Sequence, residues 1–358
     1  MKKLIILLIT VFFLHGTVFA EETTGIDTSA VTGGLPEEVS ELLPEFTENE
    51  TADFWSSLKT MFFGSFAEAS GSFHSALGLC AVLLGLMTLC SVAEMSSVQV
   101  SSGAVTGAGA LGMTAAVMGT FQSMIVMAAD TVRSMTEYSA CMLPVMASAT
   151  AIGGGISSSA ALYAGTALFS QILMQLISRL FIPGVYFYLC ISMAESALST
   201  DTLSEIREFI GWLISKGLRL VLSVFIGYMT ITGVVAGTAD ATALKATKAA
   251  ISGMVPVVGG IISDASESLV ASAVMLKSSV GVFGMLAVLG IVMLPFLRVG
   301  IHYLLLKMTA AVSGTVGLKP HVGLLKNFSS AMGYLLAMCG ACAMLLLISS
   351  VCFLRVVF

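Results

Sequence analysis

Charged side chains are scarce in this sequence. Only 10% of its 358 residues are Asp, Glu, Lys or Arg, whereas 57% are hydrophobic and the mean hydropathy is +0.98. A soluble protein carries about 25% charged residues and could not cover its surface with so few. The composition therefore excludes an ordinary cytosolic enzyme, a disordered protein and a nucleic-acid-binding protein. It indicates that most of the chain lies in a lipid bilayer.

Motifs that catalyse reactions or bind cofactors are also missing. The sequence contains no G-x-x-x-x-G-K-[ST] nucleotide loop, no H-E-x-x-H and no G-x-S-x-G. His74, His302 and His321 have no Cys or carboxylate at the spacing of a metal site. We therefore predict no catalytic, metal-binding or cofactor-binding residues, and no cofactor.

The cysteines do not indicate a redox or metal site either. All seven lie in apolar runs, where a buried Cys commonly behaves as a small hydrophobic residue. Cys339 and Cys342 match the C-x-x-C pattern, but no second pair accompanies them. A packing role is favoured over a redox or metal site.

The first twenty residues have the pattern of a secretory signal. Lys2 and Lys3 are followed by the apolar run 4–14, and Val18-Phe19-Ala20 suits a cleavage site. We predict that residues 1–20 are a signal peptide removed before Glu21. The alternative is an uncleaved first helix.

Lys and Arg are absent from residues 21–53, where ten acidic residues lie. This stretch also carries Gly33-Gly34, Pro36 and Pro44, so it can bury little apolar surface. We expect residues 21–53 to form a mobile acidic leader outside the cytosol.

Residues 54–74 combine large apolar side chains at helical spacing with a polar opposite face. Aromatic residues favour the membrane–water interface. We predict an interfacial helix over 54–74 that leads into a multi-span membrane domain over 75–358. Thr202–Leu220 has a similar pattern, with Glu205 three residues after Thr202 as in a capping box. It is predicted to be a second interfacial helix, or else the polar entry of the next span.

Uncharged stretches predict a packed all-α bundle with six to eight spans. The predicted cores are 77–92, 104–128, 138–152, 156–178, 180–194, 220–239, 278–297 and 328–354. Gly153-Gly154-Gly155 separates two of them, and the charged groups at 130–137 and 195–201 are expected in loops. Gly residues between 103 and 119 favour close helix packing. We expect the C terminus in the cytosol, which requires an odd number of spans.

Residues 240–277 form the most unusual stretch. The apolar piece 249–262 is about 21 Å long as a helix, shorter than the roughly 30 Å hydrocarbon core. Pro256, Gly259 and Gly260 interrupt it, and Asp264 is expected to be the N-cap of a new helix. The candidate pathway or assembly element comprises Lys245, Lys248, Pro256, Gly259, Gly260, Asp264, Glu267 and Lys277. A re-entrant element that lines a pathway and a plain surface loop both fit this pattern.

Residues 240–284 also carry three short motifs. These are Lys245-x-x-Lys248, Val255-Pro256-Val257-Val258-Gly259 followed by Ser263-Asp264-Ala265, and Lys277-x-x-Val280-Gly281-x-x-Gly284. Here the sequence resembles the stage III sporulation protein AE family of endospore-forming bacteria. The order of signal, polar leader and polytopic domain also fits, so the resemblance covers essentially the whole chain. It is specific around 240–284 and compositional elsewhere.

The resemblance implies a non-enzymatic subunit of a secretion-like channel complex between mother cell and forespore. The implied partners are other subunits of the stage III sporulation A complex, including a separate ATPase and ring-forming intermembrane proteins. The implied location is the mother-cell membrane around the forespore, and the implied role is support of forespore development and late forespore gene expression. Two alternatives are a stand-alone secondary transporter of a small solute and a purely structural membrane scaffold.

Overall fold

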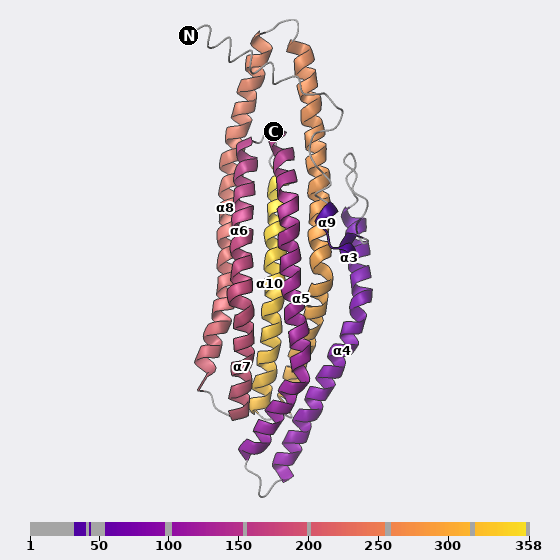
Figure 1. Cartoon of the computed structure of the whole chain (residues 1–358), viewed down its shortest axis with the longest axis vertical. Coiled ribbons are helices and arrows are strands. Elements are labelled where there is room, and N and C mark those ends of the chain that lie inside the picture. The colour runs from indigo at the N-terminus through magenta and orange to yellow at the C-terminus, as the bar shows by residue number, and fades with distance from the viewer. Residues whose placement is uncertain are drawn as a thin grey trace.

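The computed structural model is an elongated bundle of antiparallel helices (Figure 1). It describes residues 32–40, 43, 54–96, 102–152, 156–198, 202–254, 259–315 and 319–355. Within these ranges, 233–254 and 259–277 are described by their backbone alone. The predicted signal peptide lies outside the described residues, as does most of the leader.

Nine helical elements make up the described chain. They are α3 (Glu37–Ser40), α4 (Phe54–Ser96), α5 (Ser102–Ile152), α6 (Ile156–Leu176), the π-helical turn η1 (Ile177–Phe181), α7 (Ile182–Leu198), α8 (Ser204–Met254), α9 (Gly259–Ser313) and α10 (Lys319–Arg355). Six spans in the described part are long and apolar enough to cross a membrane: 55–95, 103–152, 157–198, 204–232, 278–313 and 319–354. The predicted all-α polytopic bundle is confirmed, at the lower end of the predicted number of spans.

Helix α10 is the centre of the bundle. It contacts α5, α6, α7, α8 and α9, and its inner face is lined by buried residues such as Phe328, Leu335 and Met338. Small residues bring neighbouring helices close to one another. Gly109 of α5 packs directly against Cys90 and His321, so this helix crossing depends on the absent side chain. The predicted packing role of the glycines between 103 and 119 holds at this position.

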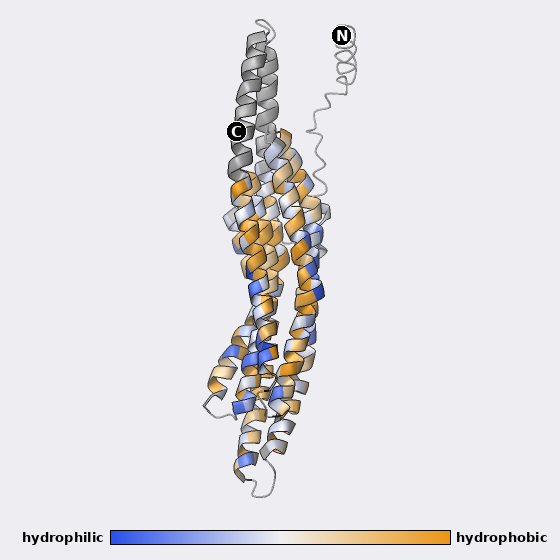
Figure 2. Cartoon of the chain, turned by 90° about the vertical axis from the view of Figure 1, so that its left-hand side faces the viewer, coloured by the Kyte–Doolittle hydropathy of each residue, from blue (hydrophilic) through white to orange (hydrophobic). Residues whose placement is uncertain are grey.

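Hydrophobic residues dominate the described part of the bundle, and hydrophilic ones become more frequent toward its lower half (Figure 2). Helix α5 contains 51 residues and is therefore about 77 Å long. A hydrocarbon core is roughly 30 Å thick. The bundle is thus much longer than the bilayer is thick.

Two predicted interfacial helices are parts of longer helices. The predicted helix 54–74 continues into the first span as α4, with no boundary at residue 74. The predicted helix 202–220 continues into the next span as α8. The unbroken α8 agrees with the alternative interpretation of 202–220, the polar entry of a span. Neither predicted boundary, at residue 74 or 220, is a Gly or Pro that would end the helix.

The leader is not entirely detached from the bundle. Helix α3 contacts α9, and Val39 is buried against the backbone of Gly290 and beside Met61. The expectation that residues 21–53 bury almost nothing is therefore wrong at this point. Val39 fills space that Gly290 leaves open on α9, and Leu35 and Leu43 also pack against the core.

Candidate functional site

The residues of the predicted pathway element fall around the junction of α8 and α9. Lys245 and Lys248 belong to α8, whereas Gly259, Gly260, Asp264, Glu267 and Lys277 belong to α9. Their side chains lie outside the described part, and so does Pro256. Helix α8 ends at Met254 and α9 begins at Gly259, and residues 255–258 lie outside the described part of the chain.

Asp264 does not cap a new helix. Helix α9 begins five residues earlier, at Gly259. A helix accommodates proline just before its start, because the first turn has no partners for its N–H groups. The chain therefore resumes its helix soon after Pro256, and Asp264 lies in the second turn.

The described side chains place a different polar cluster inside the bundle, where α7, α8 and α10 meet. Arg207 of α8 donates from Nε to Oε2 of Glu195 at 2.8 Å and from a terminal nitrogen to Oδ1 of Asn327 at 3.3 Å. The Arg207 and Glu195 side chains are only 17% and 12% exposed. A charge in this setting is stable only when it is paired, so the cluster fixes the three helices relative to one another.

Two tyrosines complete the cluster. Tyr188 donates its hydroxyl to Oδ1 of Asn327 at 3.3 Å, and its ring lies edge-on to Tyr334 at 5.3 Å. The guanidinium carbon of Arg207 lies 6.0 Å from the centre of the Tyr188 ring. The hydroxyl of Tyr334 occupies the place where a side chain at Gly211 would lie, so α8 approaches α10 closely here.

A cavity of about 500 Å³ adjoins this cluster. Glu195, Arg207 and Asn327 line it together with two further cations, Lys319 and Lys326. The second carboxylate oxygen of Glu195 is buried and accepts no hydrogen bond from the described residues. The cavity therefore has a surplus of positive charge beside one incompletely satisfied carboxylate.

A second charged cluster links α4 to α9. Arg298 donates to Oε1 of Glu68 at 2.9 Å, and the two side chains are 30% and 55% exposed. Both line a cavity of about 640 Å³, and so do Asp130 of α5 and Val39 of α3. The docked piece of the leader thus borders an open cavity that carries three charged side chains, Glu68, Asp130 and Arg298.

The acidic and basic residues that the sequence placed in loops lie within helices. Asp130, Arg133 and Glu137 are in the middle of α5, where Arg133 donates to Glu137 at 2.8 Å on an exposed face. Glu195 lies in the last turn of α7. Asp201 lies outside the described residues. Charge alone does not end a helix, because an ion pair four residues apart supports one.

Sequence reasoning did not find the Arg207 cluster. The sequence pattern places Arg207 only within the predicted interfacial helix 202–220 and gives Asn327 no role. The available signal was weak, since Asn327 is one of only two asparagines and lies at the start of a long apolar run. Its partners come from two other helices, and no local pattern connects them.

Histidine and cysteine contribute to packing. His321 is buried, with Nε2 2.9 Å from the carbonyl oxygen of Thr106, and His302 lies 2.8 Å from the Arg298 carbonyl oxygen. Cys339 and Cys342 are both buried with free thiols, as expected for packing residues. Across the residues that the structure describes, no three His, Cys, Asp or Glu side chains are grouped as a metal site.

The fold and its clusters define a multi-pass membrane protein, in which the ion pairs Arg207–Glu195 and Arg298–Glu68 join neighbouring helices. Comparison with known proteins identifies the family. The chain matches the family described as Stage III sporulation protein AE over residues 37–355, and it belongs to this family.

A curated relative is the Stage III sporulation protein AE of Bacillus subtilis (strain 168). The two sequences are 21% identical over 220 residues, which are 62% of this chain. The matched part covers 55% of the relative, so the chain matches about half the length of that protein. No solved structure matches this chain.

Proposed function

We propose that this chain is a non-enzymatic membrane subunit of a sporulation-specific, secretion-like channel complex that links mother cell and forespore. The observation that carries the proposal is the family match over residues 37–355, combined with six spans that can cross a membrane. In this role the protein supports forespore development and late forespore gene expression. Its place is the mother-cell membrane around the forespore, with the acidic leader outside the cytosol.

The sequence indicates that another subunit supplies the energy for export. The chain carries no nucleotide-binding loop, so energy for export has to come from a separate ATPase subunit. Ring-forming proteins between the two membranes are the other proposed partners. The element around the α8–α9 junction, from Lys245 to Lys277, is the proposed pathway or assembly element of this subunit.

Affinity purification from sporulating cells tests the proposal. A tag at Phe358 should retrieve a membrane complex that contains an ATPase and ring-forming proteins, identified by mass spectrometry. The same tag on an unrelated multi-pass membrane protein of these cells is the control. A chain that is purified alone, under conditions that keep other membrane complexes intact, would contradict the proposed role.

Reconstitution of the purified chain tests the alternative that it is a stand-alone transporter. Secondary transporters use ionisable residues in their spans to couple ions, and Glu68, Asp130 and Glu195 lie in candidate spans. Purified chain in sealed vesicles should show no solute uptake driven by a proton or sodium gradient. Uptake by the purified chain alone, abolished by Glu195→Gln, would favour the transporter.

A further inference from the structure

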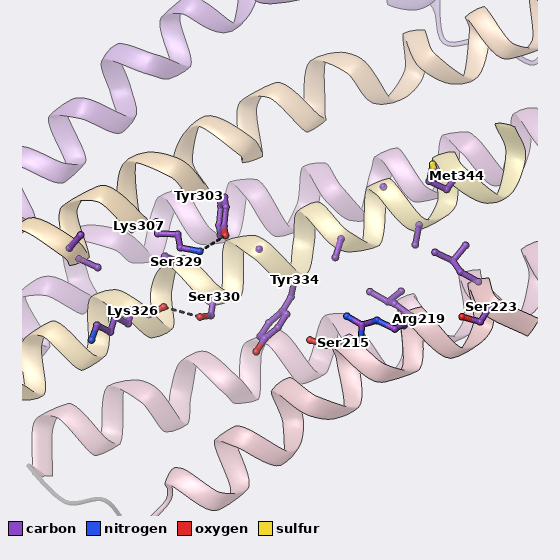
Figure 3. Close-up of a pocket in the computed structure, with 18 residues that line it drawn as sticks. Ser215, Arg219, Ser223, Tyr303, Lys307, Lys326, Ser329, Ser330, Tyr334 and Met344 are labelled. Atoms are coloured by element: carbon purple, nitrogen blue, oxygen red, sulfur yellow. Dashed lines mark hydrogen bonds between the residues drawn. The ribbon is translucent and has the colours of Figure 1, made fainter. Parts of the chain in front are cut away.

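A long groove runs along the outside of α10 between α8 and α9 (Figure 3). Its volume is about 860 Å³, and it extends from Lys326 to Met344 of α10. All three helices are candidate membrane spans over this stretch. The groove is therefore a surface that the bundle presents to its lipid surroundings.

Three cations line the groove, and none of its lining residues is acidic. Arg219 comes from α8, Lys307 from α9 and Lys326 from α10. Lys307 donates to the hydroxyl of Tyr303 at 2.8 Å, and none of the three cations has an ion pair within the described part of the chain. Cations in a membrane span require a counter-charge or a polar surrounding. An anionic ligand would supply the counter-charge that the protein lacks here.

The groove combines this charge with an apolar floor. Gly333, Ala337 and Gly340 succeed one another along α10 and leave a shallow trough between the flanking helices. In the close-up, Lys307 and Lys326 lie toward one end, Met344 lies at the other, and Arg219 lies between them (Figure 3). A ligand that fits has an anionic group at one end and a hydrocarbon part that follows the trough.

The charge and the lining of the groove favour an anionic lipid. From Lys326 to Met344 the floor is about 27 Å long. The groove lies along candidate membrane spans, and it has cations toward one end and small residues along its floor. This arrangement suits an anionic headgroup followed by an extended hydrocarbon chain.

We propose that this groove is a binding site for an anionic phospholipid. The phosphate is held by Lys307 and Lys326, and an acyl chain follows the trough toward Met344. Arg219 offers a second positive contact along the lipid. The groove adjoins the Arg207 cluster, since Tyr334 belongs to both and Lys326 also lines the neighbouring cavity. The proposal is independent of the proposed role in sporulation.

Native mass spectrometry of the full chain, released from bilayers of equal phosphatidylglycerol and phosphatidylcholine, tests the site. The wild-type chain should retain phosphatidylglycerol in preference to phosphatidylcholine. Retention should fall at least about tenfold when Arg219, Lys307 and Lys326 are all replaced by Gln. A control triple variant replaces Lys59, Arg179 and Lys216, which are exposed cations outside the groove, and should retain lipid as the wild type does.

If the triple variant does not fold, a variant with unchanged charge can still test the proposal. Ala337→Phe fills the trough without changing charge, and it should also reduce retained phosphatidylglycerol. Equal retention by the groove and control variants would overturn the proposal, and so would normal retention by Ala337→Phe. Displacement of the lipid by millimolar inorganic phosphate would show a simple anion site instead. A bound acidic protein in place of lipid would likewise refute it.

Discussion

At the residue scale, two ion pairs of similar geometry have very different surroundings. Arg207–Glu195 and Arg133–Glu137 are both 2.8 Å long. The first pair is 17% and 12% exposed and joins two helices, whereas the second is 71% and 61% exposed within α5. Breaking a buried pair leaves an uncompensated charge, whereas an exposed pair contributes little. Burial therefore decides which pair stabilises the fold.

Arg207→Ala should destabilise the protein strongly. The change leaves the carboxylate of Glu195 buried without its partner, at a cost of about 3 kcal/mol or more. Arg133→Ala, the matched control, should cost less than about 1 kcal/mol. Thermal unfolding in detergent can be followed with a thiol-reactive dye, because the thiols of Cys339 and Cys342 become accessible only on unfolding.

A double variant tests whether the destabilisation comes from leaving one charge buried and unpaired. Replacing both Arg207 and Glu195 by Met removes both charges, so it should be less damaging than Arg207→Ala alone. Equal melting temperatures for Arg207→Ala and Arg133→Ala would contradict the importance of burial.

Gly165→Ala should loosen the contact between α6 and α8. A side chain at Gly165 would collide with the ring of Tyr228, which donates its hydroxyl to the carbonyl oxygen of Ala161 at 3.0 Å. The ring would have to move and give up this bond, at a cost of about 1–3 kcal/mol. The same dye assay measures the loss.

Gly85→Ala is the matched control for this substitution. Gly85 lies inside α4, and nothing lies within 4 Å of the carbon that alanine would add. The substitution should therefore stabilise the helix by roughly 0.5–1 kcal/mol. Opposite signs of the two effects are expected. A stabilising Gly165→Ala would refute the predicted collision.

At the scale of elements, neither charge nor proline alone decides where a helix ends, since Pro144 and Pro295 lie inside α5 and α9. Gly153-Gly154-Gly155 separates α5 from α6 as the sequence predicted. The charged group at 130–137, by contrast, lies in an unbroken α5, so two predicted spans form one helix. The predicted boundary near Arg179 is also absent, because a π-helical turn joins α6 to α7. Only glycine and proline change what the backbone itself can do.

Pro256→Leu tests the interrupted element between α8 and α9. If the element is packed in the complex or lines its pathway, the variant should impair sporulation while its amount in the membrane stays normal. Val224→Leu, on an exposed face of α8, is the control and should sporulate normally. Spore counts and membrane immunoblots measure the two quantities.

Single cysteines at 252–263, in a chain without its native cysteines, sharpen this test. Several positions should react with a small water-soluble thiol reagent in the assembled complex. Uniform protection, together with labelling by a lipid-soluble probe, would indicate an ordinary lipid-facing helix.

At the scale of the whole molecule, the antiparallel order decides where the chain ends. The start of α4 and the end of α10 lie toward the same end of the bundle (Figure 1). If all six candidate spans of the described chain cross the membrane, the two ends of the membrane domain lie on one side of it. The expected cytosolic C terminus does not fit an extracytoplasmic leader, because it requires an odd number of spans.

Reporter fusions should therefore place both ends in the same compartment. A reporter active only outside the cytosol should work at Asp53 and at Phe358, and one active only in the cytosol should fail at both. A cytosolic fusion in the loop between α7 and α8 is the positive control. Activity of the two ends in opposite compartments would show a different number of spans.

The sequence by itself determined what depends on composition and on short-range backbone chemistry. Low charge and long apolar runs were enough for an all-α membrane protein. The division between α5 and α6 was predicted from the three glycines at 153–155, because the effect of glycine on the backbone is local. The short motifs at 240–284 are also local features of the sequence, and they indicated the family that the comparison confirms.

Only the tertiary structure decided which side chains meet. Arg207 reaches Asn327 across 120 residues, and Arg298 reaches Glu68 across 230. Val39 of the leader docks on α9 because Gly290 leaves room there. The cationic groove likewise needs three helices brought together. Such partners are chosen by the packing of the whole bundle, so no local pattern along the chain reveals them.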